Sequence, residues 1–171
     1  PYGIYGVFGN TEYTNENDSC VLCHQKGSKR LQKENKPIFL RNSGLVFEVD
    51  HKKVNLVGVD DPVKGKSDLK KALQGLDSNL PTVLLAHSPE IFEEAASQGI
   101  DLLLCGHNHG GQLFLTRILR DILPLDPTLE FLEGFFQKGK TLMYVSRGIG
   151  TSLLPFRFGV KPEITFLSLI H

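Results

Sequence analysis

The chain has 171 residues, 40% of them hydrophobic, and its 19 basic side chains balance its 19 acidic ones. This size and composition predict one globular domain, and 11 Phe with regular Val, Ile and Leu runs exclude disorder. No stretch reaches the about 18 apolar residues that span a bilayer, and the zero net charge provides no chain-wide field for phosphate backbones, so we expect no nucleic-acid partner.

The start of the chain limits what the sequence reveals about its compartment. The first residue is Pro1 and not Met, and residues 2–8 already have the pattern of a strand. We therefore expect residues 1–171 to be the C-terminal part of a single larger domain, with any targeting segment upstream.

Short apolar and β-branched runs alternate with amphipathic or Gly- and Pro-rich stretches, which is typical of an α/β fold. The expected strands lie at residues 3–8, 37–41, 44–50, 53–59, 82–87, 101–105, 141–146 and 163–169. Apolar residues recur with a period of about two on both sides of Lys52 and Lys53, which predicts a hairpin turn at this pair.

Two helices are expected between the strands. Residues 67–73 begin with a capping residue, Ser67, and carry apolar positions at helical spacing. Residues 89–96 follow Ser88, a good N-cap, and place Pro89 at the first helical position. Each helix would begin shortly after a strand.

Metal-type ligands follow three of the expected strands. Asn10 follows the first strand, His87 ends the fifth, and His107 and His109 follow the sixth. Side chains at the carboxyl ends of strands in an α/β sheet point into one crevice. Imidazole nitrogen and amide oxygen are ligands of transition metals, so the sequence predicts a metal site in that crevice.

Each of these residues also has a simpler explanation. A single His at a strand end is more often a hydrogen-bonded structural residue, and Gly-Asn is a common turn pair. The run Gly-His-Asn-His-Gly-Gly at residues 106–111 is harder to explain in this way, because two polar rings among three glycines pack a sheet badly. The combination favours the metal site.

The order of these motifs resembles the calcineurin-like metallophosphoesterases. The motifs that carry the resemblance are Gly-Asn at 9–10, His-Ser-Pro at 87–89, Gly-His-Asn-His-Gly-Gly-Gln at 106–112, and residues 144–152 and 155–158. The last two stretches, with residues 162–164, are similar to a bacterial branch that includes UDP-2,3-diacylglucosamine diphosphatases of lipid A synthesis. The resemblance covers essentially the whole chain.

The resemblance implies a four-layer α/β/β/α metallophosphoesterase sandwich, incomplete in this chain, with two divalent metal ions. Mn is the expected metal, with Fe or Zn as alternatives. Asn10, His87 and His107 would bind one ion and His109 the other. The family's remaining ligands would lie upstream of Pro1, so the missing N-terminal half of the domain is an expected partner, and we expect the chain alone to bind metal weakly.

The sequence departs from the family at residues 11 and 12. The family has His-Asp after Gly-Asn, whereas this chain has Thr11 and Glu12, and a Thr hydroxyl cannot act as a general acid near neutral pH. A diphosphate releases a phosphate monoester, whose second pKa is about 6, so it leaves without a proton. The substitution favours a diphosphate substrate, with UDP-2,3-diacylglucosamine as the leading candidate. The alternatives are a broad phosphodiesterase acting on a soluble substrate and a metal-retaining protein without catalysis, and no catalytic residue is assigned.

Other stretches bear on the substrate and the compartment. Arg147 and Arg157 lie in Gly-rich turns and could hold a phosphate, although structural ion pairs explain them equally well. Residues 113–124 have an apolar helical stripe that predicts either a lid packed on the fold or a surface for acyl chains or a membrane. We expect a cytoplasmic protein that rests peripherally on the inner membrane.

One short motif suggests a different cofactor. Residues 20–24 match the Cys-x-x-Cys-His of c-type haem attachment, but no haem pocket is evident around the single Met143. We interpret these thiols as an incidental part of a polar insertion.

Overall fold

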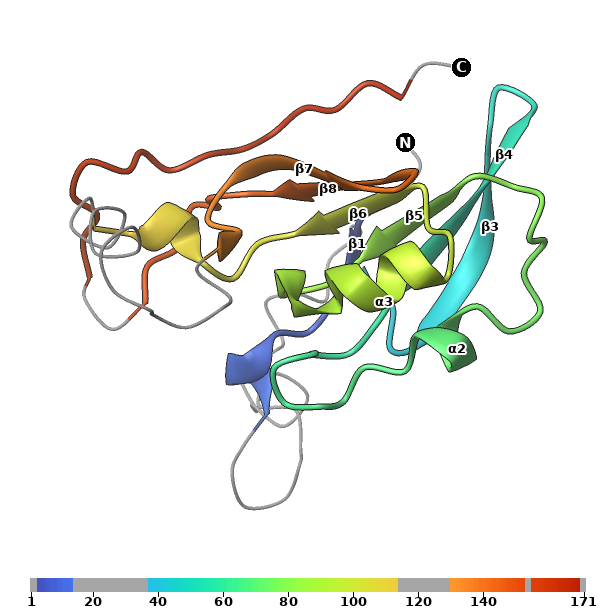
Figure 1. The fold of residues 1–171 in the computed structure, drawn as a ribbon, viewed down its shortest axis with the longest axis horizontal. Helices are drawn as coiled ribbons and strands as arrows, with labels where there is room; N and C mark the ends of the chain where they lie inside the picture. Colours follow the sequence, from blue (N-terminus) through green and yellow to red (C-terminus); the bar gives the residue numbers. More distant parts are fainter. Residues whose placement is uncertain (1–2, 14–36, 114–129, 153–154, 170–171) are drawn as a thin grey trace.

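A six-stranded mixed sheet forms the centre of the computed structural model, which describes residues 3–13, 37–113, 130–152 and 155–169 (Figure 1). Its strands lie in the order β3-β4-β5-β6-β8-β7. Their bounds are β3 Ser43–Val49, β4 Lys52–Gly58, β5 Thr82–Leu85, β6 Leu102–Cys105, β7 Gly134–Lys138 and β8 Thr141–Val145.

The four inner strands, β4, β5, β6 and β8, run parallel, and β3 and β7 pair antiparallel at the two edges. Parallel neighbours end at the same edge of the sheet, so the loops after these four strands lie next to one another. This edge carries the residues that the sequence predicts as ligands.

Two short helical segments cover one face of the sheet. The first is α2 (Leu69–Ala72), and the second is the 3-10 turn η3 (Pro89–Ile91), which continues into α3 (Phe92–Ser97). Ser88 caps η3 as predicted, because its hydroxyl accepts the Glu90 N–H at 3.4 Å. In α2 the capping residue is Asp68 and not Ser67, since the Asp68 carboxylate accepts the Lys71 N–H at 2.9 Å.

The core lies between the sheet and these helices. Val57, Leu84, Leu103 and Met143 are paired in register across β4, β5, β6 and β8, and all four are fully buried. The helices add apolar side chains to this row, namely Leu69, Ala72, Ile91, Phe92 and Ala95. The row fixes the register of the parallel strands, because a slip by one residue would turn it to the other face.

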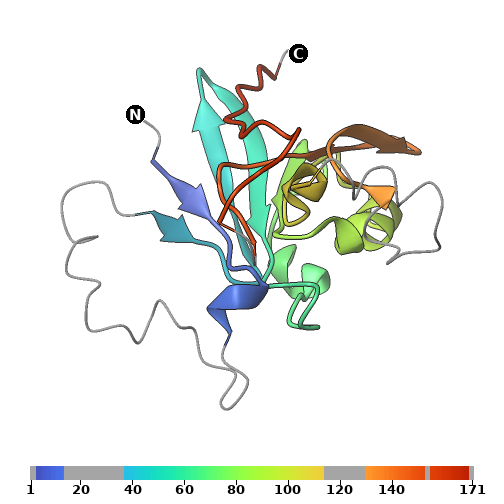
Figure 2. The same ribbon diagram turned by 90° about the vertical axis from the view of Figure 1, so that its left-hand side faces the viewer.

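A two-stranded parallel sheet, β1 (Tyr5–Gly6) with β2 (Ile38–Phe39), lies on the face opposite the helices (Figure 2). It approaches the large sheet closely at Gly58, where an added Cβ would lie 2.3 Å from Leu40 Cβ and 2.9 Å from Val7. The described residues confirm the α/β class. The four-layer sandwich stays a prediction.

The predicted hairpin turn is displaced by two residues. Val49 pairs with Lys52, so the turn residues are Asp50 and His51, whose φ angles are 50° and 64°. A two-residue hairpin loop needs positive φ at its central residues because that twist matches the flanking strands. Lys52 and Lys53 therefore belong to β4.

The ends of the chain differ most from expectation. Residues 163–169 form no strand, since they have no ladder partner within the described portion of the chain, and Ile164 and Phe166 are 75% and 94% exposed. Conversely, β7 was not predicted, although it pairs with β8 through the turn at Gly139, where φ is 57°. The first two strands are shorter than the predicted 3–8 and 37–41.

Several predicted features lie outside the described residues: the Cys20–His24 motif and almost all of the amphipathic stretch at 113–124. Among the residues that the structure does describe, no helix is long and apolar enough to cross a membrane.

The buried row predicts a clear difference between two identical truncations. Leu103→Ala removes a fully buried side chain and should lower the free energy of unfolding by about 2–5 kcal/mol. Leu142→Ala, in the neighbouring strand but 41% exposed, should lower it by about 1 kcal/mol or less. Urea unfolding followed by circular dichroism measures both, and equal losses would contradict the assignment of the core to the helix-covered face.

Candidate metal centre

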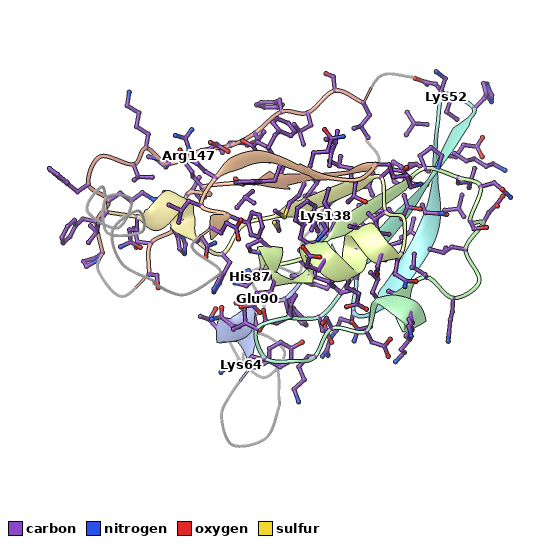
Figure 3. The ribbon with its side chains drawn as sticks, in the orientation of Figure 1. Lys52, Lys64, His87, Glu90, Lys138 and Arg147 are labelled. Atoms are coloured by element: carbon purple, nitrogen blue, oxygen red, sulfur yellow. The ribbon has the colours of Figure 1, made fainter. Side chains whose placement is uncertain are left out.

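Asn10, His87 and His107 meet at the carboxyl edge of the sheet. Asn10 begins the short turn η1 (Asn10–Glu12), and the two histidines each follow the end of their strand by two residues. His87 Nε2 lies 3.1 Å from Asn10 Oδ1 and 3.0 Å from His107 Nδ1, and the two imidazole rings are edge to face, with centroids 4.8 Å apart. Figure 3 shows His87 at this end of the sheet, far from Lys52 at the other.

The three side chains present more lone pairs than protons to one point. His87 Nε2 is within hydrogen-bond distance of Asn10 Oδ1 and His107 Nδ1, and whichever of the two ring nitrogens carries a proton, that proton can serve only one of these contacts. A divalent cation would satisfy all three atoms at once, and neutral imidazole and amide oxygen are ligands that transition metals accept. The residues present therefore fit a metal ion.

The electrostatic surroundings keep His87 in the form that binds metal. Burial, together with the nearby His107, lowers the pKa of His87 to about 4. The ring is then neutral at physiological pH, and its free lone pair needs no proton to be displaced.

His109 lies apart from this cluster. It begins the turn η4 (His109–Gly111), and its Nδ1 lies 3.3 Å from a guanidinium nitrogen of Arg157. Burial and then the charge of Arg157 lower the pKa of His109. The structure thus brings three of the four predicted ligands together, and the fourth, His109, contacts Arg157 instead. The described residues contain no group of three or more His, Cys, Asp or Glu side chains able to hold a metal, because the cluster is two histidines and an amide. The role of all four as ligands stays a prediction.

The loop that carries His107 and His109 is strained. His107, His109 and Gln112 have φ angles of 73°, 49° and 46°, in the left-handed region that side chains with a Cβ disfavour. Such conformations cost on the order of 1 kcal/mol or more each and persist only where the surroundings enforce them. Here Gly110 makes the packing possible, because a Cβ on it would lie 2.7 Å from Arg147 Cγ.

The two arginines predicted to bind substrate have protein partners. Arg147 donates from Nε to Glu163 Oε2 at 2.6 Å, and Arg157 donates to backbone carbonyl groups. Burial alone would raise the pKa of Glu163, but hydrogen bonds from Tyr144, Thr165 and Arg147 outweigh it and lower the pKa to about 2. The structural ion pair is therefore present at Arg147, and contact with substrate stays a prediction for both arginines.

Asp61 is a buried acidic residue that the predicted ligands do not include. It is fully buried in the loop after β4, and burial raises its pKa while the charge of His107 acts in the opposite direction. Its Oδ2 accepts the Lys64 N–H at 2.8 Å, whereas Oδ1 has no hydrogen-bond partner among the described residues. The sequence does place Asp60 and Asp61 directly after a buried strand, which is the position that the predicted ligands share.

Thr11 and Glu12 stabilise the turn that positions Asn10. Glu12 Oε2 accepts the Gly9 N–H at 2.6 Å, and the Thr11 hydroxyl donates to Glu12 Oε1 at 3.2 Å. Neither contact places a general acid at the cluster.

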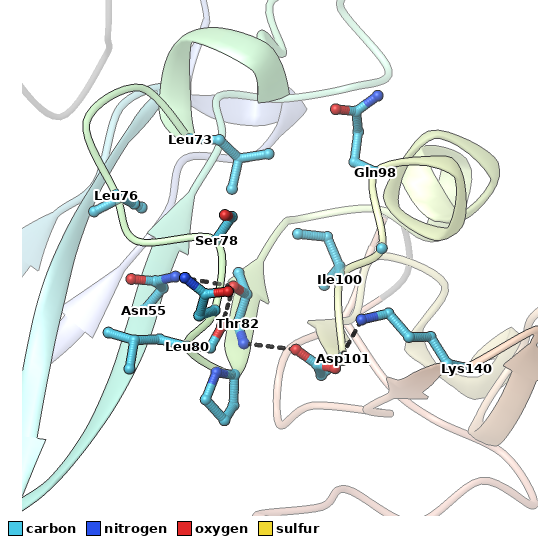
Figure 4. Close-up of a pocket in the computed structure, with 13 residues that line it drawn as sticks. Asn55, Leu73, Leu76, Ser78, Leu80, Thr82, Gln98, Ile100, Asp101 and Lys140 are labelled. Carbon is cyan, nitrogen blue, oxygen red and sulfur yellow. Dashed lines mark hydrogen bonds and ion pairs between the residues drawn. The ribbon is translucent and has the colours of Figure 1, made fainter.

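A pocket of about 390 Å³ lies at the opposite, amino edge of the sheet (Figure 4). Asp101 accepts the Thr82 N–H at 2.8 Å there and pairs with Lys140 at 3.3 Å, so both of its oxygens are used within the fold. This pocket holds no His or Cys and is remote from the histidine cluster.

The chain is similar to several curated proteins over much of its length. It is 37% identical over 120 residues to the uncharacterized metallophosphoesterase YkuE of Bacillus subtilis, which covers 70% of this chain and 42% of that protein. Identity is 31% over 167 residues with the uncharacterized metallophosphoesterase YkoQ of B. subtilis (96% and 59%) and 33% over 131 residues with the phosphodiesterase YaeI of Escherichia coli (77% and 47%).

The chain thus spans about half the length of the curated relatives it matches. No family model and no solved structure matches it. These similarities support placing the chain with the metallophosphoesterases, as its motifs predict.

A single methyl group tests the geometry of the cluster. In Gly9→Ala the added Cβ would lie 2.6 Å from His87 Cε1 and Nδ1, so the imidazole must move away from Asn10. We expect the affinity for Mn²⁺ or Zn²⁺, measured by isothermal titration calorimetry on the full-length protein, to fall at least about 10-fold.

Gly106→Ala is the matched control, because it adds the same methyl group next to His107, where the nearest atom is Ser146 O at 3.5 Å. Equal losses of affinity in the two variants would contradict the proposed contact between Gly9 and His87.

The lowered pKa of His87 predicts a dependence of stability on pH. Between the ordinary His value of about 6.5 and the folded value of about 4, the unfolded chain binds a proton that the folded chain does not. In the presence of a chelator, the free energy of unfolding should therefore fall as the pH is lowered through this window. Urea unfolding at several pH values measures the slope, which should be smaller in His87→Gln and unchanged in His51→Asn at the hairpin turn. An unchanged slope in His87→Gln would refute the assignment.

Proposed function

We propose that the protein hydrolyses phosphodiester or diphosphate bonds with the help of two divalent metal ions. Asn10, His87 and His107 would hold one ion and His109 would contribute to the other. The observation that carries the proposal is the convergence of Asn10 Oδ1 and His107 Nδ1 on His87 Nε2, at 3.1 and 3.0 Å, at the carboxyl edge of the sheet. The curated relatives named metallophosphoesterases and a phosphodiesterase support it independently.

The chemistry divides between the ions and the chain. Bound divalent ions would supply a water of lowered pKa and stabilise charge at phosphorus. The chain holds its donors neutral and rigid, because burial lowers the pKa of His87 and the strained loop fixes His107. A water oxygen forms the new bond to one phosphorus, the bridging P–O bond breaks, and the bridging oxygen leaves with the second group.

The leaving group is expected to need no proton. Thr11 occupies the position next to Asn10, and its hydroxyl donates to Glu12, so this turn offers no acid near neutral pH. An alkoxide would leave poorly under these conditions, whereas a phosphate monoester leaves as an anion. We infer that the substrate is a diphosphate.

An apolar group on the substrate is favoured by the surface beside the cluster. Ile149, Phe156 and Phe158 are 71%, 53% and 69% exposed and flank the turn that contacts His109 through Arg157. Scattered apolar side chains are normal at a surface, but three next to a phosphate site suit an acyl chain or a membrane. The leading substrate is therefore a lipid-linked nucleotide sugar such as UDP-2,3-diacylglucosamine, hydrolysed at the cytoplasmic surface of the inner membrane.

Two alternatives make different predictions. A broad phosphodiesterase would act on soluble activated esters, and the name of the relative YaeI favours this reading. A metal-retaining protein without catalysis would bind ions but release no product, which the absence of a His after Asn10 favours.

A paired assay separates these functions. The full-length protein with Mn²⁺ is incubated with UDP-2,3-diacylglucosamine and, separately, with bis-p-nitrophenyl phosphate. Release of UMP from the first substrate alone is the expected result, release of only p-nitrophenol indicates the soluble phosphodiesterase, and silence with both indicates lost catalysis.

His107→Ala should reduce whichever activity is found by more than about 100-fold. Loss of a residue that only supports a metal ligand costs up to about 100-fold, and loss of a ligand itself should cost more. His51→Asn, at the hairpin turn, should retain it. Activity that survives in His107→Ala would remove the metal assignment.

A further inference from the structure

The guanidinium group of Arg157 is fully engaged with the backbone. Nη1 donates to His109 O at 3.1 Å, and Nε donates to Gly150 O at 2.9 Å. Nη2 lies within hydrogen-bond distance of two further carbonyl oxygens, Arg147 O at 2.7 Å and Gly148 O at 3.1 Å, and of Gly150 O again at 2.5 Å. One side chain thus connects the histidine loop after β6 to the turn after β8.

Arg157 could bind a substrate phosphate only by giving up these hydrogen bonds. Each of the three guanidinium nitrogens already donates to a carbonyl oxygen, and the planar fork of Arg cannot turn toward a phosphate without breaking several of these bonds. Arg157 was expected to bind substrate, but its geometry is that of a residue that holds two loops together.

The same contacts lead to His109. The Gly150 carbonyl accepts twice from Arg157, and Arg157 Nη2 also lies 3.3 Å from His109 Nδ1. The fit is close, because a Cβ on Gly150 would lie 3.4 Å from His109 Cε1. Arg157 therefore contacts the His109 ring directly and also fixes the His109 backbone through its carbonyl.

We propose that Arg157 is a positioning residue, which sets the orientation of His109 through its contacts with the His109 carbonyl and imidazole and thereby the affinity of the second metal ion. The inference rests on the proposed function, since it takes His109 as a ligand. Loss of a residue that orients a metal-ligating His costs about 10–100-fold in metal affinity. His109 also has φ 49°, so its conformation depends on contacts that hold it in place.

Metal titration of the full-length protein tests this role directly. Co²⁺ binding is measured by calorimetry and by visible absorption in wild type, His109→Ala, Arg157→Gln and Arg157→Lys. His109→Ala identifies the binding event that depends on His109. We expect Arg157→Gln to weaken that event by about 10–100-fold and the other by no more than about twofold.

Two variants control for charge. Lys161→Gln removes an equal positive charge from an exposed position in the same segment and should leave both events unchanged. Arg157→Lys keeps the charge but lacks the planar fork, so it should also weaken the His109 event. Full affinity in Arg157→Lys would show that charge alone suffices and would overturn the proposal. This variant keeps the test decisive if Arg157→Gln does not fold.

Kinetics distinguish positioning from substrate contact. At limiting Mn²⁺ the Arg157 variants should lose kcat, recover it when Mn²⁺ is raised, and keep KM within about twofold. A raised KM with unchanged metal titrations would mean that Arg157 contacts substrate. If wild type binds no Co²⁺ at all, the proposed function fails. If wild type binds Co²⁺ and the Arg157 variants bind it equally well, only the positioning role of Arg157 fails.

Discussion

The parallel register of β5 and β6 is the constraint on which the candidate site depends. Leu85 and Leu104 are partners in the ladder, and beyond them Gly106 N–H donates to His87 O at 3.0 Å. The pairing therefore continues past the strands until both histidine loops leave the sheet together. The register is fixed by the buried row through Leu84 and Leu103, so the packing of the core determines the distance between His87 and His107.

That proximity creates a local conflict that the rest of the site accommodates. Asn10 Oδ1 and His107 Nδ1 both lie within 3.1 Å of His87 Nε2, and burial keeps His87 neutral, so a single proton can serve only one of the two contacts. The histidine loop adds backbone strain at His107 and His109. Arg157 opposes this strain with backbone contacts from a distant part of the chain. Arrangements of this kind are expected where the binding of a cation offsets the unfavourable free energy of assembling the site.

The sequence predicted the parts of this structure that follow from local pattern. Strand periodicity, the Ser88 cap and the positions of His87 and His107 after their strands all depend on neighbouring residues. The errors have a different cause. The hairpin turn moved to Asp50 and His51 because strand register, a non-local property, decides which residues adopt positive φ. Residues 163–169 have the composition of a strand but no ladder partner in the described structure, and Asp61 became informative only once its burial was known.

The central claim is that Asn10, His87 and His107 bind one metal ion together. Anomalous diffraction at the Mn or Zn absorption edge, from crystals of the full-length protein grown with that metal, tests it most directly. The account predicts an anomalous peak at about 2 Å from Asn10 Oδ1 and from one ring nitrogen of each histidine. Peaks elsewhere in the molecule, with these three side chains still hydrogen-bonded to one another as they are here, would contradict it.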